Sequence, residues 1–283
     1  MVTSLLECST ILITGATSGL GRGMAVRLLK EHPNVKLIIT GRREQSLQEI
    51  VTEYGSSRVA AIPFDLAKVE NISELAEKAL ACFNGSLDGV ILNAGMQRVF
   101  KFTARDAAKS VDMQALRMEL DVNYTSQVAL TQHLLPHLIE VAKAGKPASI
   151  NFVTSSLSLV PIKTCLNYCA TKAALHSFIL CIRGQVDELN LDGKLGVTEI
   201  VPPLVNSELH DAKHQPELAF DTRGHPPNSM SLGDYLDGVW EGWSMKGGPP
   251  DEITVGTSTK SSWEKVDKPR KEIIARFWPN FDR

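Results

Sequence analysis

The sequence predicts an α/β protein: a doubly wound parallel sheet of about seven strands with helices on both faces. Short runs rich in Ile, Val and Leu alternate along the chain with longer segments whose apolar residues recur three and four positions apart. Strands that are apolar throughout are typical of a parallel sheet buried on both faces, and the longer segments are typical of amphipathic helices. Because we find no linker, repeat or low-complexity tract, we expect the 283 residues to form a single domain.

The individual strands are predicted from their apolar runs. They are Thr10–Thr14, Val35–Thr40, Val59–Phe64, Gly89–Leu92, Ser149–Thr154, Gly196–Val201 and Ile253–Val255. A sheet of this kind binds ligands beyond the carboxyl ends of its strands, so the residues that directly follow each strand are the first candidates for a site.

Two segments depart from the strand–helix alternation. Residues 203–230 are rich in Pro and His and lack periodicity, and a loop of that length in a compact domain is usually functional, so we predict a substrate lid there. The tail at about 257–283 is polar and then turns apolar at Ile273–Trp278. We expect it to be loosely held, with a short helix docked on the surface.

Composition excludes several classes of protein. With 43% hydrophobic and 22% charged residues, the chain has ordinary globular composition, and its net charge of −2 argues against nucleic acid as a main partner. The N-terminus has no basic segment before its apolar run, and no apolar stretch approaches the length of a membrane span. Five cysteines without zinc-like spacing fit free thiols in a reducing compartment, so we expect a soluble cytoplasmic protein.

Histidines give no clear metal signal. His133 and His137 are four residues apart, as are His210 and His214, and that spacing occurs in zinc sites. Neither pair has a third candidate ligand with supporting spacing, so we predict no metal site.

The first strand runs directly into a glycine-rich turn, Thr14 to Gly21, that is followed by a helical pattern. Glycines there let the backbone turn tightly and approach a pyrophosphate, whose charge then lies at the positive helix N-terminus. The candidate cofactor-binding residues of this turn are Gly15, Thr17, Ser18, Gly19, Leu20 and Gly21.

The end of the second strand favours NADP over NAD. Gly41 stands where NAD-binding proteins of this architecture hold an acidic residue to the ribose hydroxyls, and Arg42 and Arg43 follow at once. Paired guanidinium groups suit a 2′-phosphate, although the same arginines could simply open a solvated helix. After the third strand, Asp65 and Leu66 are candidates for the adenine, and Asp65 could equally cap the next helix.

Further candidates follow the fourth and fifth strands. Small residues at Asn93, Ala94 and Gly95 would allow close passage of a cofactor ribose. Tyr168 and Lys172 are four positions apart on a predicted helix, which places an ammonium one turn from a phenol. A nearby cation stabilises a phenolate, so we expect the pKa of Tyr168 to be lowered and the group prepared for proton transfer.

The sequence resembles the short-chain dehydrogenase/reductase family, whose fold is Rossmann-type. The resemblance is carried by the spacing T-G-x-x-x-G-x-G at Thr14–Gly21, by the N-A-G segment and by the Y-x-x-x-K pair. The resemblance runs from about Thr10 to Val205. It implies that Tyr168 is the general acid/base and that Lys172 binds the nicotinamide ribose. Ser155, thirteen positions before the tyrosine, would hold the substrate carbonyl oxygen, and Asn123 would keep a helix kinked around a proton-relay water.

After the sixth strand the sequence departs from the family pattern. The family usually has Pro-Gly and then a threonine, whereas this chain has Pro202 and Pro203, with Asn206 or Ser207 left to replace the threonine. Pro202 and Val205 remain cofactor-binding candidates, because Val205 can still offer its backbone to the carboxamide.

The resemblance therefore implies an NADP-dependent oxidoreductase that transfers hydride between NADPH and a hydrophobic ketone or aldehyde. The apolar residues expected around its site are Met96, Phe100, Leu157, Val160, Leu204 and Val205. An epimerase, isomerase or dehydratase that keeps its NADP without net turnover is the alternative. A sensor or scaffold without chemistry is disfavoured, because it would need no tyrosine acid.

The family also commonly assembles through the two long helices that flank the fifth strand. They are expected here at about Met113–Ala144 and Leu166–Asn190. Both carry more apolar residues than one buried face requires, including Leu130, Leu134, Leu138, Phe178 and Ile182. A homodimer or homotetramer is the expected assembly.

Overall fold

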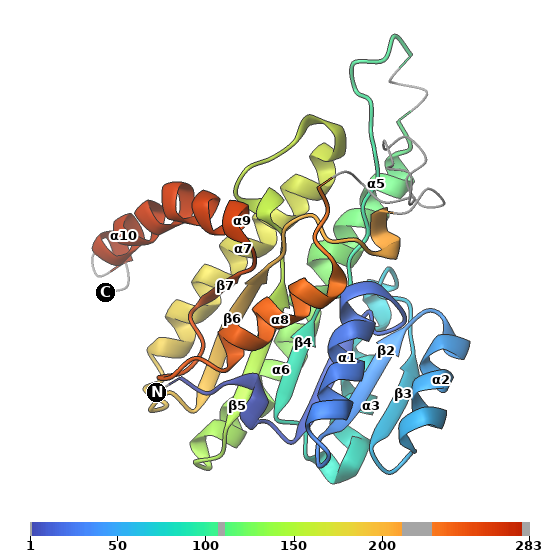
Figure 1. The fold of residues 1–283 in the computed structure, drawn as a ribbon, viewed down its shortest axis with the longest axis vertical. Helices are drawn as coiled ribbons and strands as arrows, with labels where there is room; N and C mark the ends of the chain where they lie inside the picture. The colour runs from blue at the N-terminus through green and yellow to red at the C-terminus, as the bar shows by residue number, and fades with distance from the viewer. Residues whose placement is uncertain (1, 107–110, 211–227, 279–283) are drawn as a thin grey trace.

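A computed structural model describes residues 2–106, 111–210 and 228–278 and shows a seven-stranded, all-parallel sheet between two layers of helices (Figure 1). The strand order is β3-β2-β1-β4-β5-β6-β7. The strands are β1 (Thr10–Thr14), β2 (Lys36–Gly41), β3 (Val59–Pro63), β4 (Gly89–Leu92), β5 (Ala148–Val153), β6 (Leu195–Val201) and β7 (Glu252–Thr254). The predicted fold class is confirmed, and every strand boundary lies within one residue of its predicted position.

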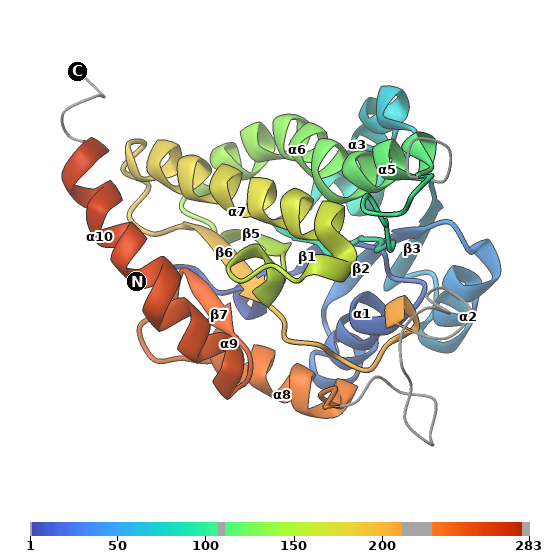
Figure 2. The same ribbon diagram turned by 90° about the horizontal axis from the view of Figure 1, so that it is seen from above.

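Helices cover both faces of the sheet. The helices are α1 (Gly19–Glu31), α2 (Glu44–Tyr54), α3 (Ile72–Ala81), α5 (Met113–Leu120), α6 (Ser126–Lys143), α7 (Leu166–Asp187), α8 (Leu232–Trp243), α9 (Thr257–Ser262) and α10 (Lys268–Phe277). The shorter helical turns are η1 (Leu5–Glu7), η2 (Val69–Asn71), η3 (Cys82–Gly85), η4 (Asp121–Thr125), η5 (Ser156–Ser158), η6 (Lys163–Cys165), η7 (Glu208–His210) and η8 (Trp263–Asp267). Helices α1, α2 and α8 form one layer and α3, α6 and α7 the other (Figure 2).

Each layer encloses its own hydrophobic core. Successive strand residues point to opposite faces of a sheet, so Ile11 packs under α1 and α8 whereas its neighbour Leu12 packs under α3 and α6. Both side chains are fully buried. This two-sided burial is the reason that the strands are apolar throughout.

The apolar residues that suggested an oligomer interface lie mostly inside the protomer. Leu130, Leu134 and Leu138 have no exposed surface, and Ile182 is buried beside them in the core under α6 and α7. Phe178 packs edge-on against the rings of Tyr124 and Phe152. These residues are therefore not a spare apolar face, and that reason for expecting an interface is wrong.

The segment Lys163–Asp187, which contains α7, is long and apolar enough to cross a membrane by length and composition alone. More than half of its most apolar window, 56%, is buried inside the fold. Because a core helix passes the same test, this segment is weak evidence for a membrane span.

The described part of the C-terminal tail is held more firmly than predicted. His176 of α7 contacts Glu199 of β6 through Nδ1 (2.7 Å) and Asp267, at the end of η8, through Nε2 (2.9 Å). All three side chains are buried, and we call them the Glu199–His176–Asp267 network. Glu199 also accepts a hydrogen bond from the Thr154 hydroxyl (2.5 Å), so the network reaches the end of β5. Beyond it, α10 extends along the edge of the molecule (Figure 1).

The two ends of the predicted lid meet. Val205 and Met230 form a parallel bridge, and the Asn206 amide donates to the Met230 carbonyl oxygen at 2.8 Å. Most of the predicted segment 203–230, from 211 to 227, lies outside the described residues. The two described ends of the predicted lid therefore lie side by side.

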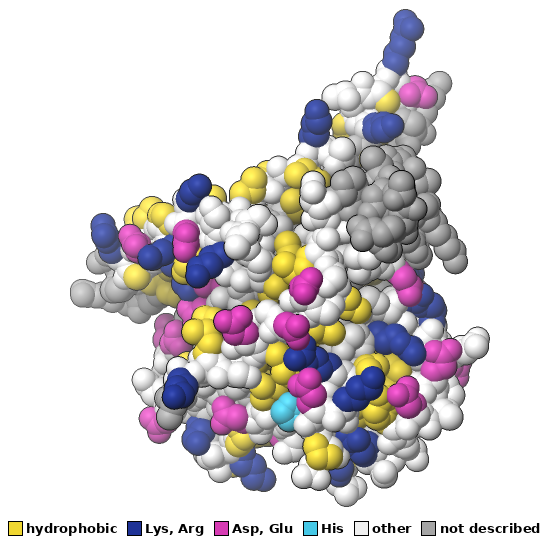
Figure 3. Space-filling model, in the orientation of Figure 1, with side chains coloured by type: hydrophobic (Ala, Val, Ile, Leu, Met, Phe, Trp, Pro, Cys, Tyr) yellow, Lys and Arg dark blue, Asp and Glu magenta, His cyan; other side chains and the backbone are white. Residues whose placement is uncertain are grey.

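On the face that carries α1 and α8, Lys and Arg side chains are interspersed with Asp and Glu (Figure 3). This mixture agrees with the net charge of −2.

Candidate active site

The glycine-rich turn packs tightly against the end of β4. Gly15 and Gly19 have φ of 70° and 52°, a backbone region that glycine adopts readily. A Cβ on Gly21 would lie 2.4 Å from both the Gly15 carbonyl oxygen and the Asn93 amide nitrogen. Ser18, the N-cap of α1, makes no side-chain capping bond, so the first turn of this helix keeps its N–H groups for another acceptor.

Thr14 ties the ends of β1 and β4 together, and sequence reasoning did not assign it a role. Its hydroxyl oxygen accepts hydrogen bonds from the backbone amides of Asn93 (2.9 Å) and Ala94 (3.1 Å). The Asn93 side chain in turn donates to the Thr14 carbonyl oxygen (3.0 Å). Its position as the first residue of the T-G-x-x-x-G-x-G motif is the sequence signal that could have predicted this role.

Ser155, Tyr168 and Lys172 come together at the carboxyl end of β5. All three side chains are buried, with 7%, 6% and 2% of their surface exposed. Ser155 lies close enough to the Tyr168 phenol to lower its pKa. The Lys172 ammonium lies 5.7 Å from the centroid of the Tyr168 ring and donates to the Val153 carbonyl oxygen at 2.8 Å.

The pKa of Tyr168 is raised, which is opposite to the predicted direction. Burial is the largest cause, the hydrogen bond from Ser155 opposes it, and the charges of Cys165 and Glu119 add to the rise. Burial also lowers the pKa of Lys172 to about 8, against the attraction of Glu199. The spacing of tyrosine and lysine was predicted correctly, but desolvation of the phenol outweighs the influence of the cation.

Asn123 lies in the middle of η4, a π-helical turn between α5 and α6. Its side chain accepts from the Met96 amide and donates to the Met96 carbonyl oxygen, both at 2.8 Å. It also donates to the hydroxyl of Thr171, the neighbour of Lys172. The helix is therefore distorted at the predicted residue, and the loop after β4 is fixed to that distortion.

Gly95 leaves space at the centre of this group. A Cβ on Gly95 would lie 3.5 Å from both the Lys172 ammonium and the Asn123 Oδ1. A larger side chain would extend into the region between the lysine and the glycine-rich turn.

The end of β2 contacts the glycine-rich turn through Thr17. A Cβ on Gly41 would lie 2.6 Å from the Thr17 methyl group, so a side chain there would require Thr17 to move. Arg42 and Arg43 are both exposed. Arg43 donates to the Thr17 hydroxyl (3.2 Å) and pairs with Glu208 (2.5 Å).

The remaining predicted cofactor residues flank this region. Asp65 accepts a hydrogen bond from the Ala67 amide (3.1 Å), as expected for a turn or cap, and Leu66 beside it is buried. The Pro202 carbonyl oxygen accepts from the Ser156 amide (2.8 Å). A Cβ on Gly19 would lie 3.4 Å from the Ser207 Cβ, so Ser207 lies directly against the turn.

The apolar residues predicted around the site divide into two groups. Met96 and Phe100 are buried, and Leu157 packs against the cluster that contains Tyr168. Val160 and Leu204 are exposed, at 47% and 38%. Val205 belongs to the core under α1 and α8.

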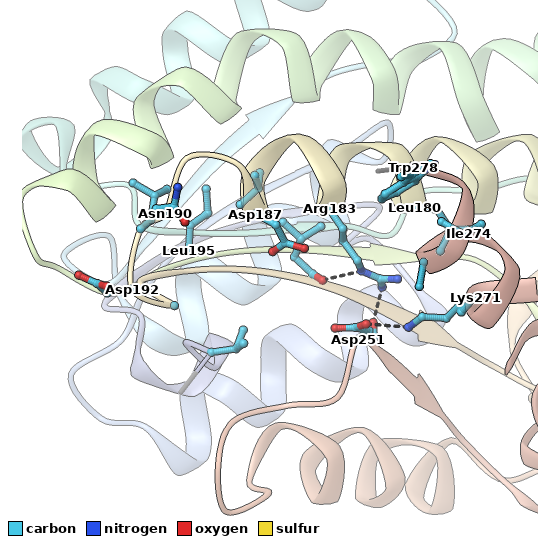
Figure 4. A pocket seen from close by; sticks show the side chains of 16 residues that line it. Leu180, Arg183, Asp187, Asn190, Asp192, Leu195, Asp251, Lys271, Ile274 and Trp278 are labelled. Atoms are coloured by element: carbon cyan, nitrogen blue, oxygen red, sulfur yellow. Dashed lines mark hydrogen bonds and ion pairs between the residues drawn. The ribbon is translucent and has the colours of Figure 1, made fainter. Parts of the chain in front are cut away.

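A pocket of about 570 Å³ lies far along α7 from Tyr168, between the C-terminal half of that helix and α10 (Figure 4). Two of its basic groups already have partners: Lys271 pairs with Asp251 at 2.6 Å, and Arg183 pairs with Glu252 and donates to the Val197 carbonyl oxygen. None of the predicted site residues lines it.

Within the part of the chain that the structure describes, no group of three His, Cys, Asp or Glu side chains is arranged to hold a metal ion. His137 contacts the Leu87 carbonyl oxygen at 2.8 Å. His214, from the second predicted pair, lies outside the described residues.

Comparison with known proteins gives a consistent picture. The family model described as short chain dehydrogenase matches residues 9–218. The chain is 32% identical over 210 residues to Dehydrogenase/reductase SDR family member 7B of Mus musculus, a match that covers 72% of this chain and 60% of that protein. It is also 32% identical over 238 residues to the uncharacterized oxidoreductase DltE of Bacillus subtilis, covering 83% of this chain and 85% of the relative. The chain thus spans about 60% of the length of the mouse relative.

Solved structures show the same fold at low sequence identity. A short-chain dehydrogenase from Sphingobium yanoikuyae, solved in complex with NADPH, has a TM-score of 0.72 at 19% identity and covers 94% of this chain and 95% of its own. A short chain dehydrogenase/reductase from Burkholderia phymatum in complex with NAD has a TM-score of 0.68 at 19% identity and covers 83% and 85%.

Proposed function

The chain belongs to the short-chain dehydrogenase family, and from this membership we propose that it is an NADP-dependent oxidoreductase acting on a hydrophobic ketone or aldehyde. The observation that carries the proposal is the buried group of Ser155, Tyr168 and Lys172, in which the ammonium lies 5.7 Å from the centroid of the tyrosine ring. An acid, an oxygen-binding hydroxyl and a cation at one strand end are the parts that carbonyl reduction requires.

The residues present fit a dinucleotide. The first turn of α1 has no side-chain cap, the glycines at its start exclude side chains, and Gly95 leaves space beside Lys172. The residues that would hold the cofactor are Gly15, Thr17, Ser18, Gly19, Leu20, Gly21, Arg42, Arg43, Asp65, Leu66, Asn93, Ala94, Gly95, Tyr168, Lys172, Pro202 and Val205. When bound, the reduced nicotinamide supplies a hydride to the carbonyl carbon.

The chain's own residues would then bind and protonate the oxygen of the substrate. Ser155 donates a hydrogen bond to the carbonyl oxygen and Tyr168 gives it a proton as negative charge develops. The raised pKa of Tyr168 keeps the phenol protonated at neutral pH, which is the form that reduction needs. Lys172, fixed by its bond to the Val153 carbonyl, holds a ribose hydroxyl, and Asn123 maintains the distorted helix beside it.

A carbonyl screen tests the function directly. We expect ketones or aldehydes with an apolar body to be reduced with loss of one NADPH for each product, because apolar residues such as Met96, Phe100, Val160 and Leu204 are expected around the site. Absorbance of NADPH is followed across a panel of ketones, quinones and aldehydes. Conversion of a substrate without net loss of NADPH would instead support a cofactor-retaining epimerase, isomerase or dehydratase.

Cofactor choice rests on the end of β2. Steric contact with Thr17 disfavours an acidic residue at position 41, and Arg43 lies beside Thr17 on the same side of the turn. The Arg43–Glu208 pair is about half exposed on both sides, and exposed ion pairs contribute little to stability. A 2′-phosphate can therefore replace Glu208 as the partner of this arginine at small cost.

We expect NADPH to bind about tenfold to a hundredfold more tightly than NADH, since a charge-assisted bond to phosphate contributes on the order of 1.5–3 kcal/mol. In Arg43→Ala the preference should fall close to parity while NADH affinity stays unchanged. Fluorescence titration of both cofactors measures this. Lys143→Ala, which removes an exposed, ion-paired cation on α6, is the matched control. Equal or tighter binding of NADH by the wild type would contradict the assignment.

Assembly and location are the remaining parts of the proposal. The family likeness supports a homodimer or homotetramer, and five free cysteines support a reducing location such as the cytoplasm. Sedimentation velocity at micromolar concentration should then show a species of at least twice the protomer mass.

A further inference from the structure

Glu119, at the end of α5, is a fully buried carboxylate close to the site that the mechanism does not use. Its Oε2 accepts a hydrogen bond from the Asn167 side chain at 2.9 Å, and its Oε1 accepts one from the Arg98 backbone amide at 3.2 Å. Glutamate is almost never fully buried unless it is paired. Here each carboxylate oxygen accepts one hydrogen bond from the surrounding chain.

The two partners of Glu119 belong to different parts of the candidate site. Arg98 lies in the loop after β4, two residues from Met96, which Asn123 holds. Asn167 directly precedes Tyr168 and also donates to the Leu116 carbonyl oxygen at 3.2 Å. One carboxylate thus connects the loop that borders the substrate space to the first turn of the helix that carries the tyrosine.

We propose that Glu119 is a positioning residue that fixes Tyr168 relative to the loop after β4, and that this buried carboxylate acts on the proton transfer by Tyr168 through its charge. The inference rests on the proposed function, because it assigns Glu119 a part in the proton transfer by Tyr168.

The electrostatic surroundings are consistent with both roles. Burial raises the pKa of Glu119 to about 7; the Asn167 and Arg98 hydrogen bonds and the charge of Arg98 oppose the rise, and Cys169 adds to it. Glu119 also contributes to the raised pKa of Tyr168, on α7, and to that of Cys165, which directly precedes this helix. When Glu119 is ionised, its charge raises the pKa of the Tyr168 phenol, so the phenol is a weaker acid and its phenolate is harder to form. When Glu119 is neutral, the phenolate needed for alcohol oxidation forms more easily.

Exchanging donor and acceptor tests the positioning role. Glu119→Gln leaves one acceptor oxygen for two donors, the Asn167 side chain and the Arg98 amide, so one of them faces an NH2 group, and we expect kcat to fall about tenfold to a hundredfold. Adding Asn167→Asp restores an acceptor opposite the new donor, and kcat should recover by at least about tenfold. Glu140→Gln, an exposed acid on α6, is the control and should leave kcat unchanged. A double variant as slow as the single one would overturn the positioning role.

The charge is tested by pH. Alcohol oxidation by the wild type should show an inflection near pH 7 that Glu119→Gln removes, with NADPH affinity unchanged in both proteins. Infrared difference spectra give a second readout that needs no turnover: a protonated-carboxyl band should appear as the pH falls through 7 in the wild type only. The same inflection and band in Glu119→Gln would refute the electrostatic role.

Failure of the proposed function has a different signature. It would appear as no carbonyl reduction by the wild type or as a fully active Tyr168→Phe, whatever the infrared spectra show. If Glu119→Gln does not fold, Asn167→Ala leaves the carboxylate in place and removes only its side-chain donor. That variant should lose kcat while retaining the infrared band, and unchanged kcat would refute positioning.

Discussion

Tyr168→Phe should lower turnover by about 10²–10⁴-fold, because removal of a general acid takes away the proton that the developing alkoxide needs. The ring stays in place, so its contacts with Leu157 and the helix are kept. NADPH should still bind, since Lys172 and the glycine-rich turn remain. This is the largest effect on activity that we expect from removing a single atom.

The alternative is that Tyr168 is only a core aromatic, in which case stability and activity would fall together. Turnover, NADPH affinity and melting temperature are therefore measured on one preparation. Tyr235→Phe is a close control: Tyr235 is fully buried under α8, and its hydroxyl has no hydrogen-bond partner among the described residues. It should keep full turnover. A folded Tyr168→Phe that is as active as wild type would disprove the catalytic assignment.

His176→Ala should destabilise the protein by about 3–5 kcal/mol, because it leaves Glu199 and Asp267 as buried carboxylates without their shared partner. Chemical denaturation measures the loss. His133→Ala removes an exposed histidine on α6 and should change the free energy of unfolding by no more than about 0.5 kcal/mol. A His176→Ala protein as stable as this control would show that the network contributes nothing.

The same network predicts how stability depends on pH. Hydrogen bonds to the two carboxylates raise the pKa of His176 from 6.5 to about 9, and this outweighs its burial. A group whose pKa is raised by folding stabilises the folded state fully below its unfolded value, so this contribution is complete below pH 6.5 and is lost as the pH rises through 9. The pKa of Asp267 is lowered to about 2, so its contribution is complete above 3.8 and is lost as the pH falls through 2. The deficit of His176→Ala should therefore be greatest between about pH 4 and 6.5, shrink as the pH rises from 6.5 to 9, and be smallest above pH 9.

The sheet and the main site residues could be predicted because their signals are local. Each buried strand is a short apolar run, and Gly15, Gly21, Ser155, Tyr168 and Lys172 stand at fixed spacings within or after such runs. The π-helical turn at Asn123 was expected only through the family resemblance. These features depend on residues close together in sequence.

The features that could not be predicted depend on tertiary burial. His176, Glu199 and Asp267 are distant in sequence, and nothing around any of them indicates that they meet. Glu119 looks like an ordinary polar residue of a helix until its full burial is known. The direction of the Tyr168 pKa shift was wrong for the same reason, because spacing shows the nearby cation and not the desolvation.

Thr14 and Asn123 order backbone at the site before any ligand binds, which affects the entropy of ligand binding. Each fixes a backbone segment at the rim of the site by two hydrogen bonds made within the protein itself. Ordering one residue costs about 1–2 kcal/mol of conformational free energy, and here that loss is incurred during folding. A ligand that meets a preorganised rim retains more of its contact energy as affinity. Replacing Thr14 would therefore weaken binding without removing any contact to the ligand, and calorimetry would record the change as a less favourable entropy.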